Sequence, residues 1–308
     1  MNRRNWFQLT GLTALSSAFT LPVNALSSPS KKKGTDFRFS LNTSTIMGNR
    51  AGIEKYIEIA AKAGYDGAEI WIMDLRAYLD SGKSLSSLNK KIQDSGITIE
   101  NAIGFAPWMV SDDEERKKGY QQLEQEMNLL SEIGCKRVAA PPFGLKPESV
   151  PPFSALGTYY AEILDLGKKT GVMPQLEFWG ASGTIFNLGQ VMHIAAAANH
   201  PDVKLLPDIY HLFRGGSDFD GLKLLSGNAI DIFHFNDYKL NKLREEQTDS
   251  DRIYPGDGDA PMEKIIDILK NMGGVKVLSL ELFNKDYWKQ DELKVAKTGL
   301  EKMKKLIT

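Results

Sequence analysis

The sequence contains a single cysteine and four histidines among its 308 residues. One cysteine excludes a disulfide framework and a zinc knuckle built from cysteines. A metal site in this chain would therefore take most of its ligands from aspartate and glutamate. The chain also lacks a G-x-G-x-x-G turn after its first predicted strand, which is the fingerprint of dinucleotide-binding sheets. The apolar run near the N-terminus, about residues 7–21, is shorter than the roughly 20 residues that a membrane span needs.

Acidic and basic residues are unevenly distributed along the chain. Residues 1–33 carry five basic residues and no acidic one, so the rest of the chain is acidic, although the formal net charge is only −1. An acidic body argues against a nucleic-acid partner, whose binding surface would be basic. Hydrophobic residues make up 42% of the chain and charged residues 25%, which is typical of a folded globular protein.

The N-terminal residues predict an export signal. Arg3 and Arg4 precede Trp6-Phe7 and the apolar run, a pattern that resembles a twin-arginine export signal. Small residues favour cleavage after Ala25, with residues 26–35 as a linker. We therefore expect an exported, periplasmic protein with no stable membrane insertion once the signal is removed. A general secretory signal or an anchor are the alternatives.

From residue 36 onward, short β-rich runs alternate with amphipathic helical stretches. The predicted strands are 37–42, 66–71, 97–104, 136–140, 172–178, 203–208, 229–237 and 275–283, and the helices are 53–63, 85–94, 111–133, 152–170, 188–199, 219–225, 261–271 and 291–306. Such alternation requires a parallel sheet covered by helices. Eight units predict an α/β fold, a single-domain (β/α)8 TIM barrel over residues 36–308, with a doubly wound open sheet as the rival.

A polar residue ends each of the last four predicted strands. These residues are Glu177, Asp208, His234 and Glu281, and each lies in an otherwise apolar run. In such a barrel the functional groups gather at the carboxyl ends of the strands. Taken singly, each residue has a structural explanation, such as an ion pair, a helix N-cap or a hydrogen-bonded core histidine. Together, three carboxylates and one imidazole predict a site for a divalent cation.

At this point the chain resembles the sugar isomerase/epimerase superfamily, with its xylose isomerase-like barrel. The strings that carry the resemblance are LEFWG, DIYHLFRGG, FHFND and LSLELF around the four strand ends, with AGYDGAEIW and YPGDGDAPMEKIIDIL in support. The resemblance covers residues 36–308. It implies one divalent ion, with Mn²⁺ expected and Mg²⁺, Co²⁺ or Zn²⁺ as alternatives.

The resemblance also implies roles for these residues. Glu177, Asp208, His234 and Glu281 would hold the ion, and Glu177 and Glu281 would also act as the acid/base pair. His211 would bind a substrate oxygen. The expected reaction is isomerisation or epimerisation of a sugar or sugar derivative, by proton abstraction next to a carbonyl that the ion polarises, through an enediolate.

Substrate recognition is expected to differ from that of the best-known epimerases of this superfamily. Those enzymes carry an arginine six residues after the histidine of strand seven, where this chain has Leu240. We also see no phosphate cradle. The candidate substrate-binding residues are Trp71, Trp108, Trp179, Asn236 and Asp237.

Three other functions stay open. A lyase or dehydratase acting on a keto-sugar or 3-keto-glycoside would use the same proton abstraction and then eliminate a substituent. An endonuclease of the same superfamily would need further histidines on strands two and three, which this chain does not have. A carbohydrate-binding protein without turnover would not need both glutamates. The sequence names neither the sugar, nor the preferred metal, nor the oligomeric state, although an oligomer is possible.

Overall fold

Eight strands alternate with helices along residues 35–308, the part of the chain that this computed structural model describes. The predicted export signal and almost all of the predicted linker lie outside the described residues. The strands are β1 Thr35–Asn42, β2 Gly67–Trp71, β3 Thr98–Ile103, β4 Arg137–Ala140, β5 Met173–Glu177, β6 Leu205–Leu206, β7 Ile232–His234 and β8 Gly274–Leu280. The helices are α1 Ile53–Ala63, α2 Ile72–Asp80, α3 Leu85–Ser95, α4 Asp113–Glu132, α5 Phe153–Thr170, α6 Leu188–Ala198, α7 Ile209–Arg214, α8 Met262–Met272 and α9 Glu292–Ile307.

Every strand pairing between neighbours is parallel, but the strands form two sheets. One runs β3-β2-β1-β8-β7 and the other β4-β5-β6. Single bridges, Leu205 to Ile230 and Asp208 to His234, join the β6 and β7 segments. The prediction of eight parallel strand–helix units is therefore confirmed, whereas one continuous eight-stranded ladder is not seen. Pro207 directly follows the two-residue β6 and lacks an N–H, which limits ladder formation at this point.

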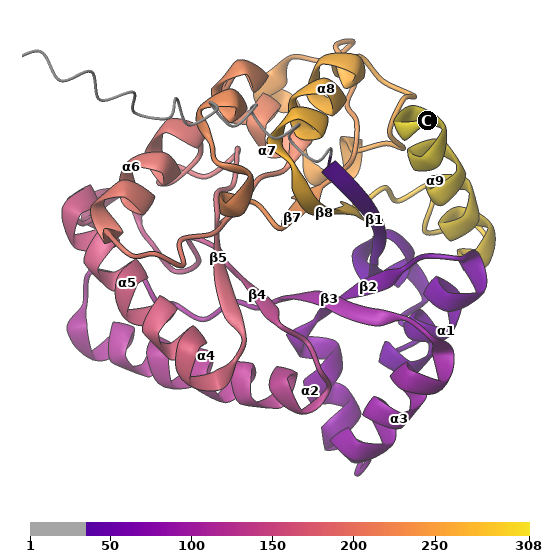
Figure 1. The fold of residues 1–308 in the computed structure, drawn as a ribbon, viewed down its shortest axis with the longest axis horizontal. Coiled ribbons are helices and arrows are strands. Elements are labelled where there is room, and N and C mark those ends of the chain that lie inside the picture. Colours follow the sequence, from indigo (N-terminus) through magenta and orange to yellow (C-terminus); the bar gives the residue numbers. More distant parts are fainter. Residues whose placement is uncertain (1–34) are drawn as a thin grey trace, which may run out of the picture. The chain divides into compact units, whose positions relative to one another are not determined.

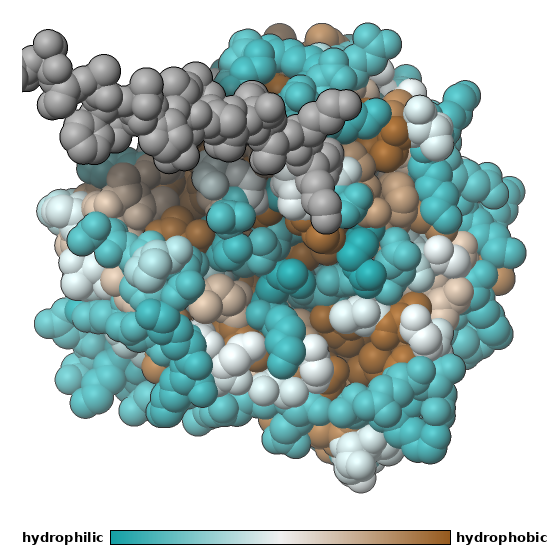
Figure 2. All heavy atoms as spheres, in the orientation of Figure 1, coloured by the Kyte–Doolittle hydropathy of each residue, from teal (hydrophilic) through white to brown (hydrophobic). Residues whose placement is uncertain are grey.

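Helices surround the strands in Figure 1. Most of the hydrophobic core lies between the strands and the helices around them. A second, smaller cluster consists of side chains from five of the strands. Its members are Ile103, Ala139, Leu206, Ile232 and Val277. Such a cluster is what fills the interior of a barrel of this type. In Figure 2 hydrophilic residues cover the outer helices, and hydrophobic ones show in the gaps between them.

Local sequence signals explain most helix ends. The α4 helix begins after Asp112, whose side chain accepts a 2.8 Å hydrogen bond from the Glu115 amide. The α6 helix has a full capping box formed by Asn187 and Gln190. The sequence did not predict α2, which starts directly after Trp71 with no side-chain cap to announce it. Within residues 35–308, no helix combines the length and the apolar character that a membrane crossing requires.

Candidate metal centre and active site

Three of the predicted site residues meet at the ends of successive strands. Asp208, His234 and Glu281 follow or end β6, β7 and β8, and their potential ligand atoms lie within 4.8 Å of one another. All three side chains are buried. Asp208 is also the N-cap of α7, because its Oδ1 accepts a 2.9 Å hydrogen bond from the His211 amide. The N-cap role uses Oδ1 and is therefore compatible with a metal-binding role, because Oδ2 still faces the cluster.

The imidazole of His234 lies among carboxylates. Its Nε2 is 3.0 Å from Glu69 Oε1, while its Nδ1 is 3.1 Å from Glu281 Oε2 and 3.4 Å from Asp208 Oδ2. Although burial lowers the pKa of His234, Glu281 and Glu69 outweigh that effect and raise it well above its usual value. Nδ1 nevertheless makes no hydrogen bond of acceptable geometry. A buried nitrogen that faces two carboxylates without a hydrogen bond fits a cation in place of its proton.

Glu69 is a site residue that sequence reasoning missed. It ends up wholly buried on β2, and it receives hydrogen bonds from three other side chains. Asn101 Nδ2 donates to Oε1 at 2.7 Å, and Asn42 Nδ2 and Ser279 Oγ donate to Oε2 at 2.9 and 2.5 Å. Burial raises the pKa of Glu69, but His234 and these donors lower it on balance. A carboxylate that fixes the far nitrogen of a histidine is the usual support of a metal-ligating imidazole.

Arg252 is the second residue that the sequence did not announce. Its Nη1 donates to Asp208 Oδ2 and to Glu281 Oε2, both at 2.7 Å, and the side chain is only 1% exposed. Burial opposes its charge, but Asp208, Asp249 and Glu281 raise its pKa overall. Arg252 directly follows the 3₁₀ segment Asp249–Asp251, in the loop after β7, whose sequence carries no periodicity.

Glu177 ends β5 as predicted but stands apart from the group of three. It is buried and lines the same pocket as His211, Arg252 and Glu281. Burial raises the pKa of Glu177 to about 8, and the nearby carboxylates of Glu281 and Asp208 add to the rise, against His234. The carboxyl therefore holds its proton at neutral pH. Its place as a fourth metal ligand stays a prediction.

His211 faces two hydrogen-bond donors. Gly180 N–H points to Nδ1 at 3.2 Å, and Arg252 Nη2 lies 3.0 Å from Nε2. Burial, which the arginine reinforces, lowers the pKa of His211 to about 4 against the opposing effect of Asp208. The imidazole is therefore neutral, and a neutral ring can accept from only one of these two donors. Its other nitrogen carries a proton.

The structure separates the predicted substrate-binding residues. Trp71 and Trp179 line the pocket, as predicted. Trp108 does not line it: the ring is wholly buried, and its Nε1 donates to Pro141 O at 3.1 Å, so the expectation for this residue was wrong. Asp237 was also wrongly predicted, because its carboxylate accepts backbone hydrogen bonds from Gly256, Gly258 and Ala260 and shapes a loop.

Asn236 supports the cluster instead of lining the pocket. Its Nδ2 donates to Asp208 Oδ2 at 3.1 Å, and its Oδ1 accepts from the Tyr210 amide at 3.0 Å. The wholly buried side chain thus orients one carboxylate of the cluster and fixes the start of α7. We expected a residue that touches substrate, and the structure shows one that positions a predicted ligand.

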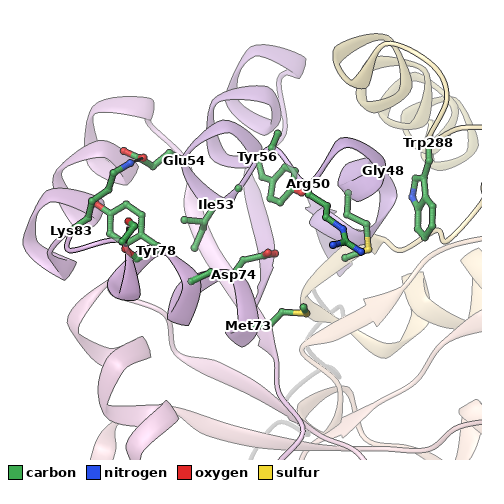
Figure 3. A pocket seen from close by; sticks show the side chains of 15 residues that line it. Gly48, Arg50, Ile53, Glu54, Tyr56, Met73, Asp74, Tyr78, Lys83 and Trp288 are labelled. Atoms are coloured by element: carbon green, nitrogen blue, oxygen red, sulfur yellow. Dashed lines mark hydrogen bonds and ion pairs between the residues drawn. The ribbon is translucent and has the colours of Figure 1, made fainter.

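Two of the cavities in the described part of the molecule are candidate sites. The one that contains Glu177, His211, Arg252 and Glu281 has a volume of about 470 Å³. A larger one, of about 730 Å³, lies between the segment Thr43–Asn49, α1 and α2 (Figure 3). None of the residues that line this larger cavity belongs to the cluster of Asp208, His234 and Glu281. The smaller cavity is therefore the candidate active site.

Comparisons with known proteins identify the family of this fold. The family model of the xylose isomerase-like TIM barrel matches residues 57–306. The chain belongs to this family. An inosose isomerase from Bacillus velezensis is 29% identical over 279 residues, which is 86% of this chain and 95% of that protein. A 3-dehydroshikimate dehydratase from Pseudomonas putida is 24% identical, over 74% of this chain and 35% of that protein.

A solved structure that is similar to this chain contains a metal. It is a crystal structure of the IOLI protein with a zinc atom bound, 25% identical, with a TM-score of 0.80. The match covers 88% of this chain and 98% of that one.

Proposed function

We propose that this protein is a divalent-metal-dependent isomerase or epimerase of a polyhydroxylated ketone, a sugar or a ring-shaped sugar derivative such as an inosose. The observation that carries the proposal is the buried cluster of Asp208, His234 and Glu281 with its unbonded His234 Nδ1. The similarity to inosose isomerases along most of the chain supports the substrate class.

The donor set fits a divalent ion. Asp208 Oδ2, Glu281 Oε2 and His234 Nδ1 would hold it in place of Arg252 Nη1, which donates to both of these oxygens in this structure. Glu69 would fix the imidazole from behind. A mixed set of oxygen and imidazole ligands suits Mn²⁺ and Zn²⁺ alike, so we propose Mn²⁺ with Zn²⁺ as the alternative. When bound, the ion would act as a Lewis acid on a substrate carbonyl and favour loss of a proton from the neighbouring carbon.

The two glutamates divide the proton transfer between them. Glu281 accepts hydrogen bonds from Arg252 Nη1 and from Asn42 Nδ2 at 2.7 and 3.0 Å, so its carboxylate is the proton acceptor. Glu177, whose pKa is raised to about 8 by burial, holds a proton and delivers it. A pair of carboxyl groups at the reacting carbon, one as proton acceptor and one as proton donor, is a recurrent acid/base arrangement. Neutral His211 lines the same pocket and would contact a substrate oxygen.

Solvent exchange tests this proposal directly. The metal-loaded protein is incubated in deuterated water with inososes and with free ketoses, and the products are followed by NMR and mass spectrometry. We expect one deuterium at a carbon next to the carbonyl, dependent on added Mn²⁺ or Zn²⁺. Glu177→Gln and Glu281→Gln should each abolish it. Exchange that persists after chelation of the metal, or in both variants, would refute the mechanism.

A dehydratase is the second candidate. The similarity to a 3-dehydroshikimate dehydratase favours it, because elimination starts with the same proton abstraction. A protonated Glu177 would then assist departure of a hydroxyl instead of returning a proton to carbon. The same experiment separates the two reactions, since a dehydratase product is lighter by one water and an isomerase product is not.

We also propose that the protein works outside the cytoplasm. The proposal rests on Arg3-Arg4 and the apolar run that ends near Ala25. Cell fractionation should recover a shortened chain from the periplasm. The full-length chain in the cytoplasm would contradict it.

A further inference from the structure

One wall of the candidate active site is aromatic. Trp71, Phe105, Trp179 and Phe283 line the 470 Å³ pocket, and we call these four residues the aromatic wall. They come from the segments that follow or end β2, β3, β5 and β8, so the fold assembles the wall from distant parts of the chain. None of the four rings is fully buried, unlike the core aromatic residues.

The rings of this wall touch one another in a continuous row. The ring centroids of Phe105 lie 5.6 Å from those of Trp71 and 6.1 Å from those of Trp179, and Trp71 is 5.9 Å from Phe283. These spacings fall in the range of favourable aromatic pairs. The wall is also tied to the cluster, because Trp71 Nε1 donates to Asn42 Oδ1 at 2.9 Å, and Asn42 donates to Glu281. It is therefore a prearranged surface.

The charged and titratable groups that line the pocket form a separate set. They are Glu177, His211, Asp249, Arg252 and Glu281. Arg252 contacts three of the other four residues, namely Glu281, His211 and Asp249. The pocket therefore has a charged floor where proton transfer would occur, and apolar ring surface beyond it. A ligand that fills both regions needs a polar part and a flat apolar part.

The size of the pocket points the same way. A volume of about 470 Å³ lies within the range of about 300–1,000 Å³ of pockets that hold a drug-sized ligand. A six-carbon polyol ring has only twelve non-hydrogen atoms, and it presents only two faces to aromatic rings. Four partly exposed rings thus offer more apolar surface than one such ring covers.

We infer that the substrate is a ring ketone that carries an aromatic substituent, such as an oxidised aryl glycoside, with the aryl group held on the aromatic wall. This inference rests on the proposed function for the reacting end of the substrate. It names the second part of the ligand, which the isomerase chemistry itself does not require. Edge-to-face and offset contacts with the wall would supply the selectivity.

Equilibrium binding tests the inference without requiring turnover. The probes are phenyl β-D-glucopyranoside and methyl β-D-glucopyranoside, titrated calorimetrically into the metal-loaded, full-chain protein. We expect the phenyl probe to bind at least fivefold more tightly. Phe105→Leu and Trp179→Leu should each reduce that preference roughly two- to tenfold, the contribution of one aromatic contact, because the phenyl probe loses more affinity than the methyl probe.

Two further variants control for damage to the fold. Phe143 contacts Phe105 at 5.5 Å between ring centroids but does not line the pocket, so Phe143→Leu should keep the full preference. Trp179→Phe retains a ring and should restore most of the preference that Trp179→Leu removes. Equal affinity for the two probes, absence of binding by both, or a preference unchanged in Phe105→Leu and Trp179→Leu would each overturn the inference.

The exchange assay on unsubstituted ring ketones keeps the two proposals distinguishable. A phenyl preference without any deuterium exchange would remove the isomerase and keep the aromatic site. Exchange without a phenyl preference would keep the isomerase and remove the aromatic substituent.

Discussion

Replacement of Glu69 by glutamine tests the metal centre through a residue that would not touch the ion. All four partners of this carboxylate present hydrogen-bond donors: Asn101 and His234 Nε2 to one oxygen, Asn42 and Ser279 to the other. Glutamine keeps the shape but has an NH₂ in place of one oxygen. In either orientation of the amide this NH₂ faces two donors. Either His234 and Asn101, or Asn42 and Ser279, then lose the oxygen to which they donate.

The magnitude follows from comparable sites. Removing the partner that orients a metal-ligating histidine costs about 10- to 100-fold in metal affinity, or about 1.4–2.8 kcal/mol. The affinity is measured by competition with a chelating dye, so that the result does not depend on activity. We expect weaker binding of Mn²⁺ and Zn²⁺ by Glu69→Gln within this range.

Glu100 supplies the matched control. It is a buried carboxylate on the neighbouring strand β3, but it pairs with Arg38 and Arg137 and makes no contact with the cluster. Glu100→Gln should lower thermal stability and leave metal affinity unchanged. Equal metal affinity in Glu69→Gln and the wild type would refute the role that we give to Glu69, and with it the assignment of His234 Nδ1 as a ligand.

Three further outcomes are expected. In metal-free protein, Glu177→Gln should become more stable relative to the wild type as the pH rises from about 5 to 8, by up to about 1.4 kcal/mol per pH unit. The reason is that burial raises the pKa of Glu177 to about 8, so unfolding of the wild type releases a proton in this pH window. A difference in Tm that does not depend on pH would contradict this. Arg252→Met should destabilise metal-free protein by about 3–5 kcal/mol, since Asp208 and Glu281 lose their buried counter-charge, and added metal should restore more stability than in the wild type; chemical denaturation checks both. His211→Ala should retain the ion and lose about 100- to 1000-fold in kcat, and normal turnover would remove the residue from the site.

Strand ends were predictable from sequence because two simple signals coincide there. Asp208, His234 and Glu281 each interrupt an apolar run just where the run ends, and parallel strands bring such positions together. The resemblance to a known superfamily added their roles. The helices were equally predictable wherever a cap and an amphipathic period coincide, as in α4 and α6.

Long-range partners were not predictable in the same way. Glu69 lies in a buried strand like any core residue, and only the packing of β2 near β7 and β8 shows that its carboxylate meets His234. Arg252 comes from a loop without periodicity, so its sequence position carries no sign of its destination. The position of Trp108 was not predictable because a tryptophan in a loop after a strand is equally suited to a pocket wall and to the core. Its place in the core depends on a distant partner, since its Nε1 donates to Pro141 O.

The closure of β1 on β8 has a consequence for biosynthesis. Asn42, at the end of the first strand, donates to both Glu69 and Glu281, and β1 pairs along its length with β8, residues 274–280. Protein chains leave the ribosome N-terminus first. A nascent chain that stops before residue 279 therefore has neither Glu281 nor any of α9, which packs on α1. A translation product truncated before residue 281 would therefore lack one of the three residues that we propose as metal ligands.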